Sequence, residues 1–310
     1  MANLPVKYLN PFTDYGFKKL FGEEPNKNLL LDFLNELLKD EQGPIVSLHY
    51  IKNEQLGSSD LDRRAIFDLY CENEAGERFI VELQKSKQRF FKDRTVYYST
   101  FPIRDQAPKN DWDYQLSAVY LIAILDFVFD EDQAEPEKYR YDVKLTDIDT
   151  CKVFYDKLTF IYLEMPKFTK TIEQLETRFD KWLYVLRNLT EIQAIPPSLQ
   201  EQVFQQLFET AEIAKFSREQ MRSYEDSLKY YRDLKNSMDT ARDEGKVEGI
   251  EIGREEGIGI GREEGIGIGR EEGVRTVALA LLREGMSEGV ILKTTGLTAA
   301  ELAQLRRELG

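Results

Sequence analysis

Two acidic residues in the first third of the chain could hold a divalent cation. Asp68 lies in a segment of alternating apolar residues, 64–72, and Glu82 lies in a second one, 78–85. If the two segments pair so that their apolar faces meet the core together, Asp68 lies directly opposite Glu82. Two opposed carboxylates repel each other unless a proton or a cation lies between them. The pair therefore predicts a site for a hard divalent ion, Mg²⁺ above all, with Mn²⁺ as the alternative.

The loop between the two segments supports this register. Pairing Phe67 with Leu83 leaves the three-residue turn Glu74-Ala75-Gly76, whose last member must take the left-handed conformation that glycine tolerates. The alternative is that both acids simply lie on the solvent face of an edge hairpin. Against it stand three apolar neighbours expected on the face of the acids, which would partly remove the pair from water: Ile66, Tyr70 and Ile80.

A basic segment follows the second acid. Between Gln84 and Lys109 the chain carries seven basic and two acidic side chains, although its net charge is −14. The negative total argues against a protein that coats nucleic acid non-specifically, but a local basic segment beside a metal site suits a phosphodiester backbone. The alternative is an ordinary solvated helix face. The candidate DNA-binding residues are Lys85, Lys87, Arg89, Lys92 and Arg94.

Helix and strand signals place these residues in an α/β core. Thr13 predicts the cap of a helix that Gly22 ends, and Pro25 opens a second helix that continues to Leu38. The apolar period then falls towards two, so the predicted order is αβββαβ. The later elements are expected as strands at 45–55, 64–72 and 78–85, a helix at 87–107, a buried central strand within 116–129 and a further strand at 157–165.

The C-terminal part is expected to be helical and to contain a repeat. Glycine recurs at every fourth position from Gly245 to Gly273, and REEGIGIG occurs twice in tandem. This spacing favours a helix that self-associates through its glycines. A flexible linker is the alternative, because each interior helical glycine costs about 0.5–1 kcal/mol. The predicted domains are a core at 1–171, a helical extension at 172–243, the repeat at 244–273 and a small helical tail at 274–310.

The tail and the composition give further expectations. The last two short helices of the tail resemble a helix-turn-helix, although a packing or oligomerisation module is the alternative. The two cysteines, Cys71 and Cys151, lie in strand-like segments and predict buried reduced thiols, which are typical of the cytoplasm. The first ten residues and the longest apolar run predict neither a signal peptide nor a membrane span.

The stretch TDYGFKKLF at 13–21, the acid Asp68, the triplet ELQ at 82–84 and the Lys-rich segment after it resemble the Rpn recombination-promoting nucleases, also labelled PD-(D/E)XK transposases. The resemblance extends over most of 1–240, and the Gly/Glu/Arg repeat with its helical tail is similar too. It implies a restriction-endonuclease-like αβββαβ core, a mixed sheet flanked by helices, with a helical C-terminal extension. The activity it implies is Mg²⁺-dependent endonucleolytic cleavage of DNA linked to recombination or mobile elements.

The resemblance also implies roles for particular residues. Asp68 and Glu82 would be metal ligands, with the Leu83 carbonyl as a third. Asp14 matches a position from which such enzymes supply another acid. The alternative for Asp14 is a first-turn acid that favours the helix dipole, worth about 0.3–1 kcal/mol.

Gln84 departs from the general pattern of the family, which has a lysine at this position to orient or deprotonate the attacking water. A glutamine can orient water but cannot act as a base. Lys85 would point to the opposite face of the strand, so Lys18 is the better substitute. Gln84 motivates the competing hypothesis, a non-catalytic DNA-binding or assembly protein that retains the nuclease fold.

Overall fold

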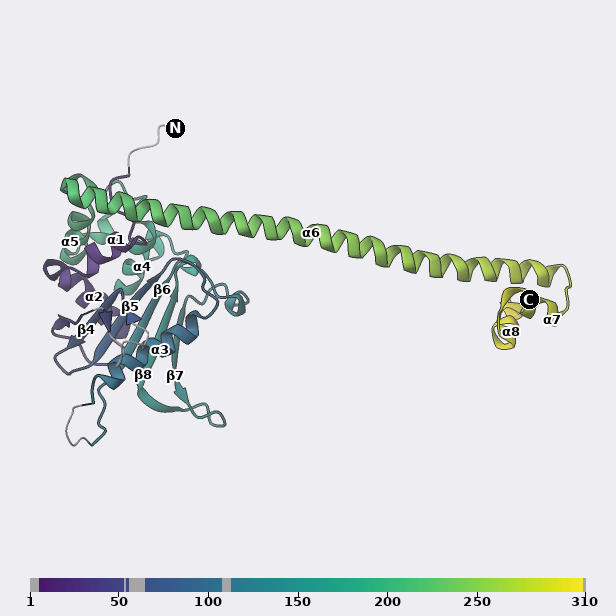
Figure 1. Ribbon diagram of the computed structural model, residues 1–310, viewed down its shortest axis with the longest axis horizontal. Coiled ribbons are helices and arrows are strands. Elements are labelled where there is room, and N and C mark those ends of the chain that lie inside the picture. The colour runs from purple at the N-terminus through teal and green to yellow at the C-terminus, as the bar shows by residue number, and fades with distance from the viewer. Residues whose placement is uncertain (1–5, 53, 56–64, 108–112, 309–310) are drawn as a thin grey trace. The chain divides into compact units, whose positions relative to one another are not determined.

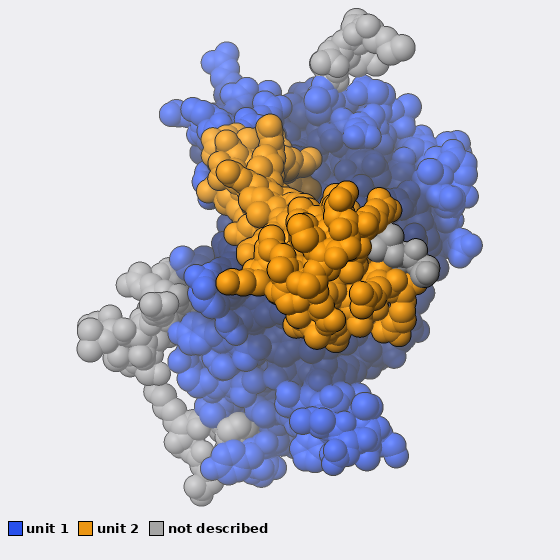
Figure 2. All heavy atoms as spheres, turned by 90° about the vertical axis from the view of Figure 1, so that its right-hand side faces the viewer, with its two compact units in different colours: residues 1–236 blue, residues 237–310 orange. Residues whose placement is uncertain are grey.

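The computed structural model describes residues 6–52, 54–55, 65–107 and 113–308 (Figure 1). The chain divides into two compact units, residues 1–236 and residues 237–310, drawn in blue and orange in Figure 2. We call the first the sheet unit and the second the C-terminal unit, and each is described by itself.

The chain starts with two short helices, as its capping signals predict. In α1 (Asp14–Phe21) the Thr13 hydroxyl oxygen accepts a hydrogen bond of 3.0 Å from the Gly16 N–H, and the helix ends at Gly22. Gly16 has no room for a side chain, because a Cβ there would lie 2.2 Å from the Asn10 carbonyl oxygen. The second helix, α2 (Lys27–Leu38), follows a 3-10 turn that begins at Glu24.

A mixed sheet of six strands forms the centre of the sheet unit. Its order is β1-β4-β5-β6-β8-β7, in which β5, β6 and β8 are parallel and the outer pairs are antiparallel. A separate short ladder joins β2 (Glu54–Gln55) to β3 (Ala65–Ile66). The bounds of the six strands are β1 (Leu48–Tyr50), β4 (Leu69–Asn73), β5 (Arg78–Gln84), β6 (Val119–Leu125), β7 (Arg140–Thr146) and β8 (Val153–Glu164).

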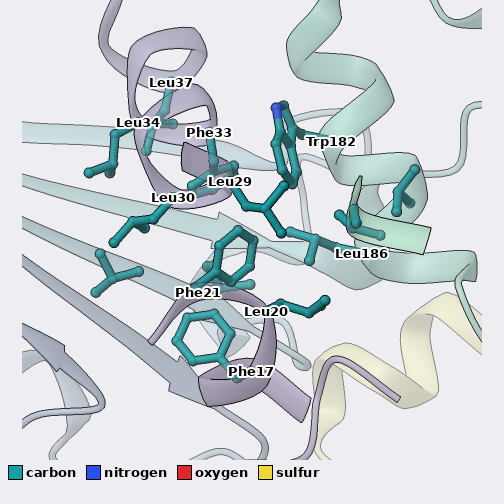
Figure 3. Close-up of a cluster of buried hydrophobic side chains, with 14 of the residues drawn as sticks. Phe17, Leu20, Phe21, Leu29, Leu30, Phe33, Leu34, Leu37, Trp182 and Leu186 are labelled. Carbon is teal, nitrogen blue, oxygen red and sulfur yellow. The ribbon is translucent and has the colours of Figure 1, made fainter. Parts of the chain in front are cut away.

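Helices cover both faces of this sheet. One face packs against α1, α2, α4 (Arg178–Asn188) and α5 (Gln202–Ala211), and the other packs against α3 (Phe91–Arg104). Aromatic rings fill the first interface around Trp182, whose ring centroid lies 5.8 Å from that of Phe21 (Figure 3). Because both faces are covered, β6 is buried at all seven positions, as its unbroken apolar run predicts. The predicted fold class, an α/β core with a mixed sheet flanked by helices, is confirmed.

The predicted hairpin register is present from Leu69 onwards, where Leu69 faces Val81. Gly76 has a φ of +75°, as the three-residue turn requires. The strand expected at 64–72 is nevertheless interrupted, because β3 ends at Ile66 and β4 begins at Leu69. Residue 64, like residues 53 and 56–63, lies outside the described part of the chain.

Because of the interruption, the side chains of Phe67 and Ile66 do not lie where strand alternation predicts. Phe67 does not pair with Leu83 in the ladder but packs beside Tyr70 and Ile80 on the α3 face. Ile66, which we expect from the sequence to flank the acids, is instead 63% exposed. Both predictions are wrong for the same reason: strict alternation of side chains holds only within a continuous strand.

The helical part begins within the sheet unit. Helix α6 (Arg218–Arg283) starts there and runs without interruption through the glycine repeat, past the boundaries at 243/244 and 273/274 that composition suggests. In the C-terminal unit, α7 (Glu288–Thr295) and α8 (Ala299–Glu308) follow. A small core joins these two helices to the end of α6 and consists of Ala278, Ile291, Leu302 and Leu305.

The two cysteines differ in their surroundings. Cys71 is buried, whereas Cys151 is exposed in the turn between β7 and β8 with a φ of 54°. The prediction of a buried thiol is therefore wrong for Cys151, since that residue lies outside the strands. Among the described residues, no helix combines the length and the apolar character needed to cross a membrane.

Candidate metal site

Asp68 and Glu82 meet at the carboxyl end of β5. The Asp68 N–H donates to Glu82 Oε1 at 3.2 Å, and the Leu83 N–H donates to Asp68 Oδ2 at 2.7 Å. Glu82 is only 5% exposed. Asp68 lies in the interruption between β3 and β4, where its N–H bonds to the Glu82 carboxylate and its own carboxylate bonds to the backbone of β5.

Burial dominates the electrostatics of this pair. Burial, together with the negative charge of the neighbouring Asp68, raises the pKa of Glu82 from its usual value of 4.5 to about 8. Burial also raises the pKa of Asp68, and Asp14 contributes in the same direction. The positive charge of Lys18 opposes both shifts. The metal-free pair therefore retains a proton near neutral pH, and a divalent cation would relieve the same repulsion.

The donors present suit an ion that accepts few protein ligands. The described part of the chain holds no cluster of three or more His, Cys, Asp or Glu side chains. Mg²⁺ commonly keeps several waters and binds through one or two carboxylates, so Asp68 and Glu82 fit it. Leu83 is the neighbouring residue whose backbone could add an oxygen, because its N–H already bonds to Asp68.

Gln84, the third member of the triplet, is held from two sides. Its Oε1 accepts from Arg94 Nη2 at 2.7 Å, and its Nε2 donates to the Ser86 carbonyl oxygen at 2.8 Å. Arginine carries only donors, so the atom of Gln84 that faces it must be the oxygen. The same Nη2 lies 3.9 Å from Glu82 Oε2. Helix α3 thus brings a guanidinium group to the triplet.

Two aromatic rings of α3 support this guanidinium. Arg94 Cζ lies 4.9 Å from the ring centroid of Phe91 and 5.5 Å from that of Tyr98. The three residues are spaced three and four apart, which places them on one helix face. From the sequence we assign Arg94 only to general DNA contact, so its place in the site is missed. The sequence feature that could have indicated it is the spacing of Arg94, three residues after Phe91 and four before Tyr98, which predicts a cation held between two aromatic rings.

Asp14 and Lys85 form a separate pair beside the site. The structure does not bring the Asp14 carboxylate into the Asp68–Glu82 pair, because Asp14 Oδ1 bonds to Lys85 Nζ at 2.7 Å. Lys85 follows directly after β5, and its Nζ also lies 5.5 Å from the ring centroid of Tyr230. Lys18 is exposed and lies close enough for its charge to act on both acids.

An acidic turn forms ion pairs with two lysines of the basic segment. The 3-10 helix η2 (Asp130–Asp132) pairs through Asp130 with Lys87 and through Glu131 with Lys92, the latter at 2.7 Å. A cleft of about 540 Å³ lies between this turn and the start of α3. Arg89 contacts the ring of Phe90 at 5.3 Å. Lys109 lies outside the described residues.

Comparison with protein families covers most of the chain. The model of the PD-(D/E)XK nuclease family transposase matches residues 11–241, a range that includes both acids and α3. The model of the Rpn/YhgA-like nuclease family, C-terminal HTH domain, matches residues 271–307, which include the end of α6 and the two helices after it. No curated protein and no solved structure matches the chain.

Proposed function

Because the chain belongs to the PD-(D/E)XK nuclease family transposases, we propose that it is a Mg²⁺-dependent DNA endonuclease that acts in recombination or in the movement of mobile elements. The observation that supports this proposal is the pair of half-buried Asp68 and buried Glu82, in which burial and mutual repulsion raise the pKa of Glu82 and a bound cation would relieve the repulsion. Mn²⁺ is the alternative ion, and a cytoplasmic location is part of the proposal.

In this proposal Asp68 and Glu82 bind the ion, and the Leu83 carbonyl is its third protein ligand. The bound ion would supply a nucleophilic hydroxide near neutral pH and stabilise the charge of the phosphate. Gln84 orients the attacking water through the Nε2 hydrogen that Ser86 does not use. Asp14 supports the site from outside, where its charge acts on Asp68.

DNA is the proposed partner of both units. In the sheet unit, Lys87 and Lys92 would exchange their bonds to the acidic turn for DNA phosphates, while Arg89 and Lys85 add positive charge nearby. In the C-terminal unit, the helix-turn-helix domain is a second DNA-contacting module.

A second function has one specific observation in its favour. Both ends of the Gln84 amide are bonded within the protein, and the triplet offers no base. A catalytically inactive DNA-binding or assembly protein would have no use for a base there. DNA binding that needs no metal, together with the absence of any cleavage, would support this alternative.

Nicking of supercoiled plasmid in Mg²⁺ tests the proposal. We expect Asp68→Asn to lower the rate about 100-fold or more, since a catalytic ion contributes several kcal/mol to the barrier. Asp149→Asn is the matched control, because Asp149 is an exposed acid in the turn between β7 and β8. Equal rates for wild type and Asp68→Asn would reject the assignment of the site.

A further inference from the structure

Arg94 differs from the other basic residues near the site in the partners that hold it. Lys85, Lys87 and Lys92 each form an ion pair with a carboxylate of the same chain. The hydrogen bonds of Arg94 instead go to two neutral amides, to Gln84 Oε1 at 2.7 Å and to Gln88 Oε1 at 2.5 Å. An amide oxygen orients a guanidinium group without neutralising it, and the Glu82 carboxylate forms only a long ion pair with Arg94, at 3.9 Å, so much of the positive charge remains available.

The guanidinium also has donors to spare. Nη1 and Nη2 carry two N–H groups each, and each uses one of them for an amide oxygen, so a second N–H on each can serve a ligand. The Nε is buried and out of reach of a ligand. The side chain is 28% exposed, so a ligand can reach it. Among ligands, a phosphate matches both the charge and the planar fork of donors.

The guanidinium group of Arg94 lies beside the position in the triplet that lacks a positively charged side chain. Gln84 stands where the general family pattern has a lysine, and Arg94 bonds directly to the end of the Gln84 side chain. A cation at this point lies beside the carboxylates that would hold the metal ion. The scissile phosphate must approach the same place, since it is the group on which the metal ion acts.

We propose that Arg94 is a catalytic residue that contacts the scissile phosphate and supplies the positive charge that Gln84 lacks. This inference rests on the proposed nuclease function. Arg94 stabilises the negative charge that develops on the non-bridging oxygens of the phosphate and transfers no proton. The neutral amides of Gln84 and Gln88 fix the orientation of its donors.

A purely structural role for Arg94 makes a different prediction. Its stacking on Phe91 and Tyr98 buries the aliphatic stem, and loss of that packing would lower stability without changing how DNA binding depends on salt. A phosphate contact instead contributes to counterion release, so its loss lowers the slope of log K against log salt by about 1.

The test compares Arg94→Met, which keeps much of the packing, with Arg94→Lys, which keeps the charge. Binding of a short fluorescent DNA duplex is measured over a range of salt concentrations, with Ca²⁺ in place of Mg²⁺. We expect Arg94→Met to lower the salt slope by about 1 and to lower kcat for cleavage in Mg²⁺ about 100-fold or more. We expect Arg94→Lys to keep the slope and to lose less of kcat.

Arg104→Met is the matched control. Arg104 is on the same helix, and its Cζ lies 5.0 Å from the ring centroid of Phe101, much as Arg94 stacks on Phe91. We expect this control to keep the wild-type slope and kcat. An unchanged slope in folded Arg94→Met protein would overturn the inference, and circular dichroism would establish that the variant is folded. If Arg94→Met does not fold, Arg94→Gln takes its place with the same expected slope.

The binding measurement separates this inference from the proposed function. If the wild type cleaves DNA and Arg94→Met keeps the wild-type slope, the role of Arg94 is wrong and the nuclease assignment stands. If the wild type does not cleave but the slope falls in Arg94→Met, the phosphate contact stands while the nuclease proposal and a catalytic role fail.

Discussion

Glu82 is a carboxyl group that folding removes from water without giving it a close ion pair. In the described part of the chain, the cation that pairs with it, Arg94, is 3.9 Å away, and Asp68 adds a second negative charge. Such a group favours its protonated form in the folded protein and its ionised form in the unfolded chain. The site therefore costs stability at the pH at which it would bind a metal ion.

This cost predicts how stability depends on pH without metal. The folded pKa of Glu82, about 8, lies above its usual 4.5, so its contribution is fully present below pH 4.5 and is lost as pH rises through 8. At about 1.4 kcal/mol per pKa unit, the loss over the whole shift is on the order of 5 kcal/mol. Urea unfolding in EDTA from pH 5 to pH 9 should show this loss in wild type and much less of it in Glu82→Gln.

Glu74 provides a control, because its pKa is shifted in the opposite direction from that of Glu82. Its carboxyl group is exposed, and hydrogen bonds from Val46 and other backbone N–H groups lower its pKa. Glu74→Gln should leave the loss between pH 5 and pH 9 in place. Parallel pH profiles for wild type and Glu82→Gln would contradict the electrostatic description of the site.

At the scale of residues, the sequence predicts more of the acidic pair than of the residues around it. That Asp68 and Glu82 lie close together could be predicted, because the hairpin turn and the apolar pattern specify the register that β4 and β5 adopt. The bond from Arg94 to Gln84 could not, because it depends on where α3 crosses the sheet. Strand and helix periodicity do not specify that crossing.

At the scale of elements, the start of α3 and the acidic turn after β6 form one electrostatic unit. Lys87 and Lys92 point to Asp130 and Glu131 across the cleft between them. DNA phosphates would have to compete with these carboxylates for the lysines. The turn would therefore weaken the DNA binding that we propose for this segment.

Removal of the two acidic charges should strengthen DNA binding. We expect Asp130→Asn with Glu131→Gln to lower Kd about 2- to 30-fold at low salt, because exposed ion pairs are worth about 0.2–1 kcal/mol each. Fluorescence anisotropy with a labelled duplex would measure this. Glu135→Gln is the control, since Glu135 belongs to the same acidic stretch but pairs with Lys138. An unchanged Kd in the double variant would show that the turn does not compete with DNA.

The interruption between β3 and β4 shows why element boundaries resist prediction. The segment 64–72 alternates like one continuous strand, yet Phe67 and Asp68 lie outside the ladder. Phe67 is then free to pack with Tyr98 on the α3 face, at a ring centroid distance of 5.2 Å. The energy of this long-range aromatic contact is not encoded in the local period.

At the scale of the whole molecule, the repeat segment of α6 carries apolar side chains that remain exposed to solvent. Six isoleucines of the repeat are 50–63% exposed: Ile250, Ile252, Ile258, Ile260, Ile266 and Ile268. The glycines do not form one straight face, because a step of four residues advances about 40° around an α-helix. A partner that follows both sets of residues must wind around α6.

We therefore expect the chain to self-associate through 245–273. Light scattering should give a mass above the 36.2 kDa of one chain. Substitution of Ile258, Ile260, Ile266 and Ile268 by serine should reduce it to the single-chain value, because it removes the apolar surface available for burial.

The matched control changes four other exposed residues of the same repeat to glutamine: Glu255, Glu256, Glu263 and Glu264. We expect this variant to keep the higher mass. A mass of 36.2 kDa for the wild-type chain itself would make the repeat a helical connection and not an interface.

The central claim concerns the ion that Asp68 and Glu82 are proposed to bind. The most direct test is a crystal structure of the protein soaked in Mn²⁺, with anomalous diffraction data to locate the ion. We predict an anomalous peak between the two carboxylates and within ligand distance of the Leu83 carbonyl oxygen. A fully ordered site without such a peak at saturating Mn²⁺ would contradict the claim.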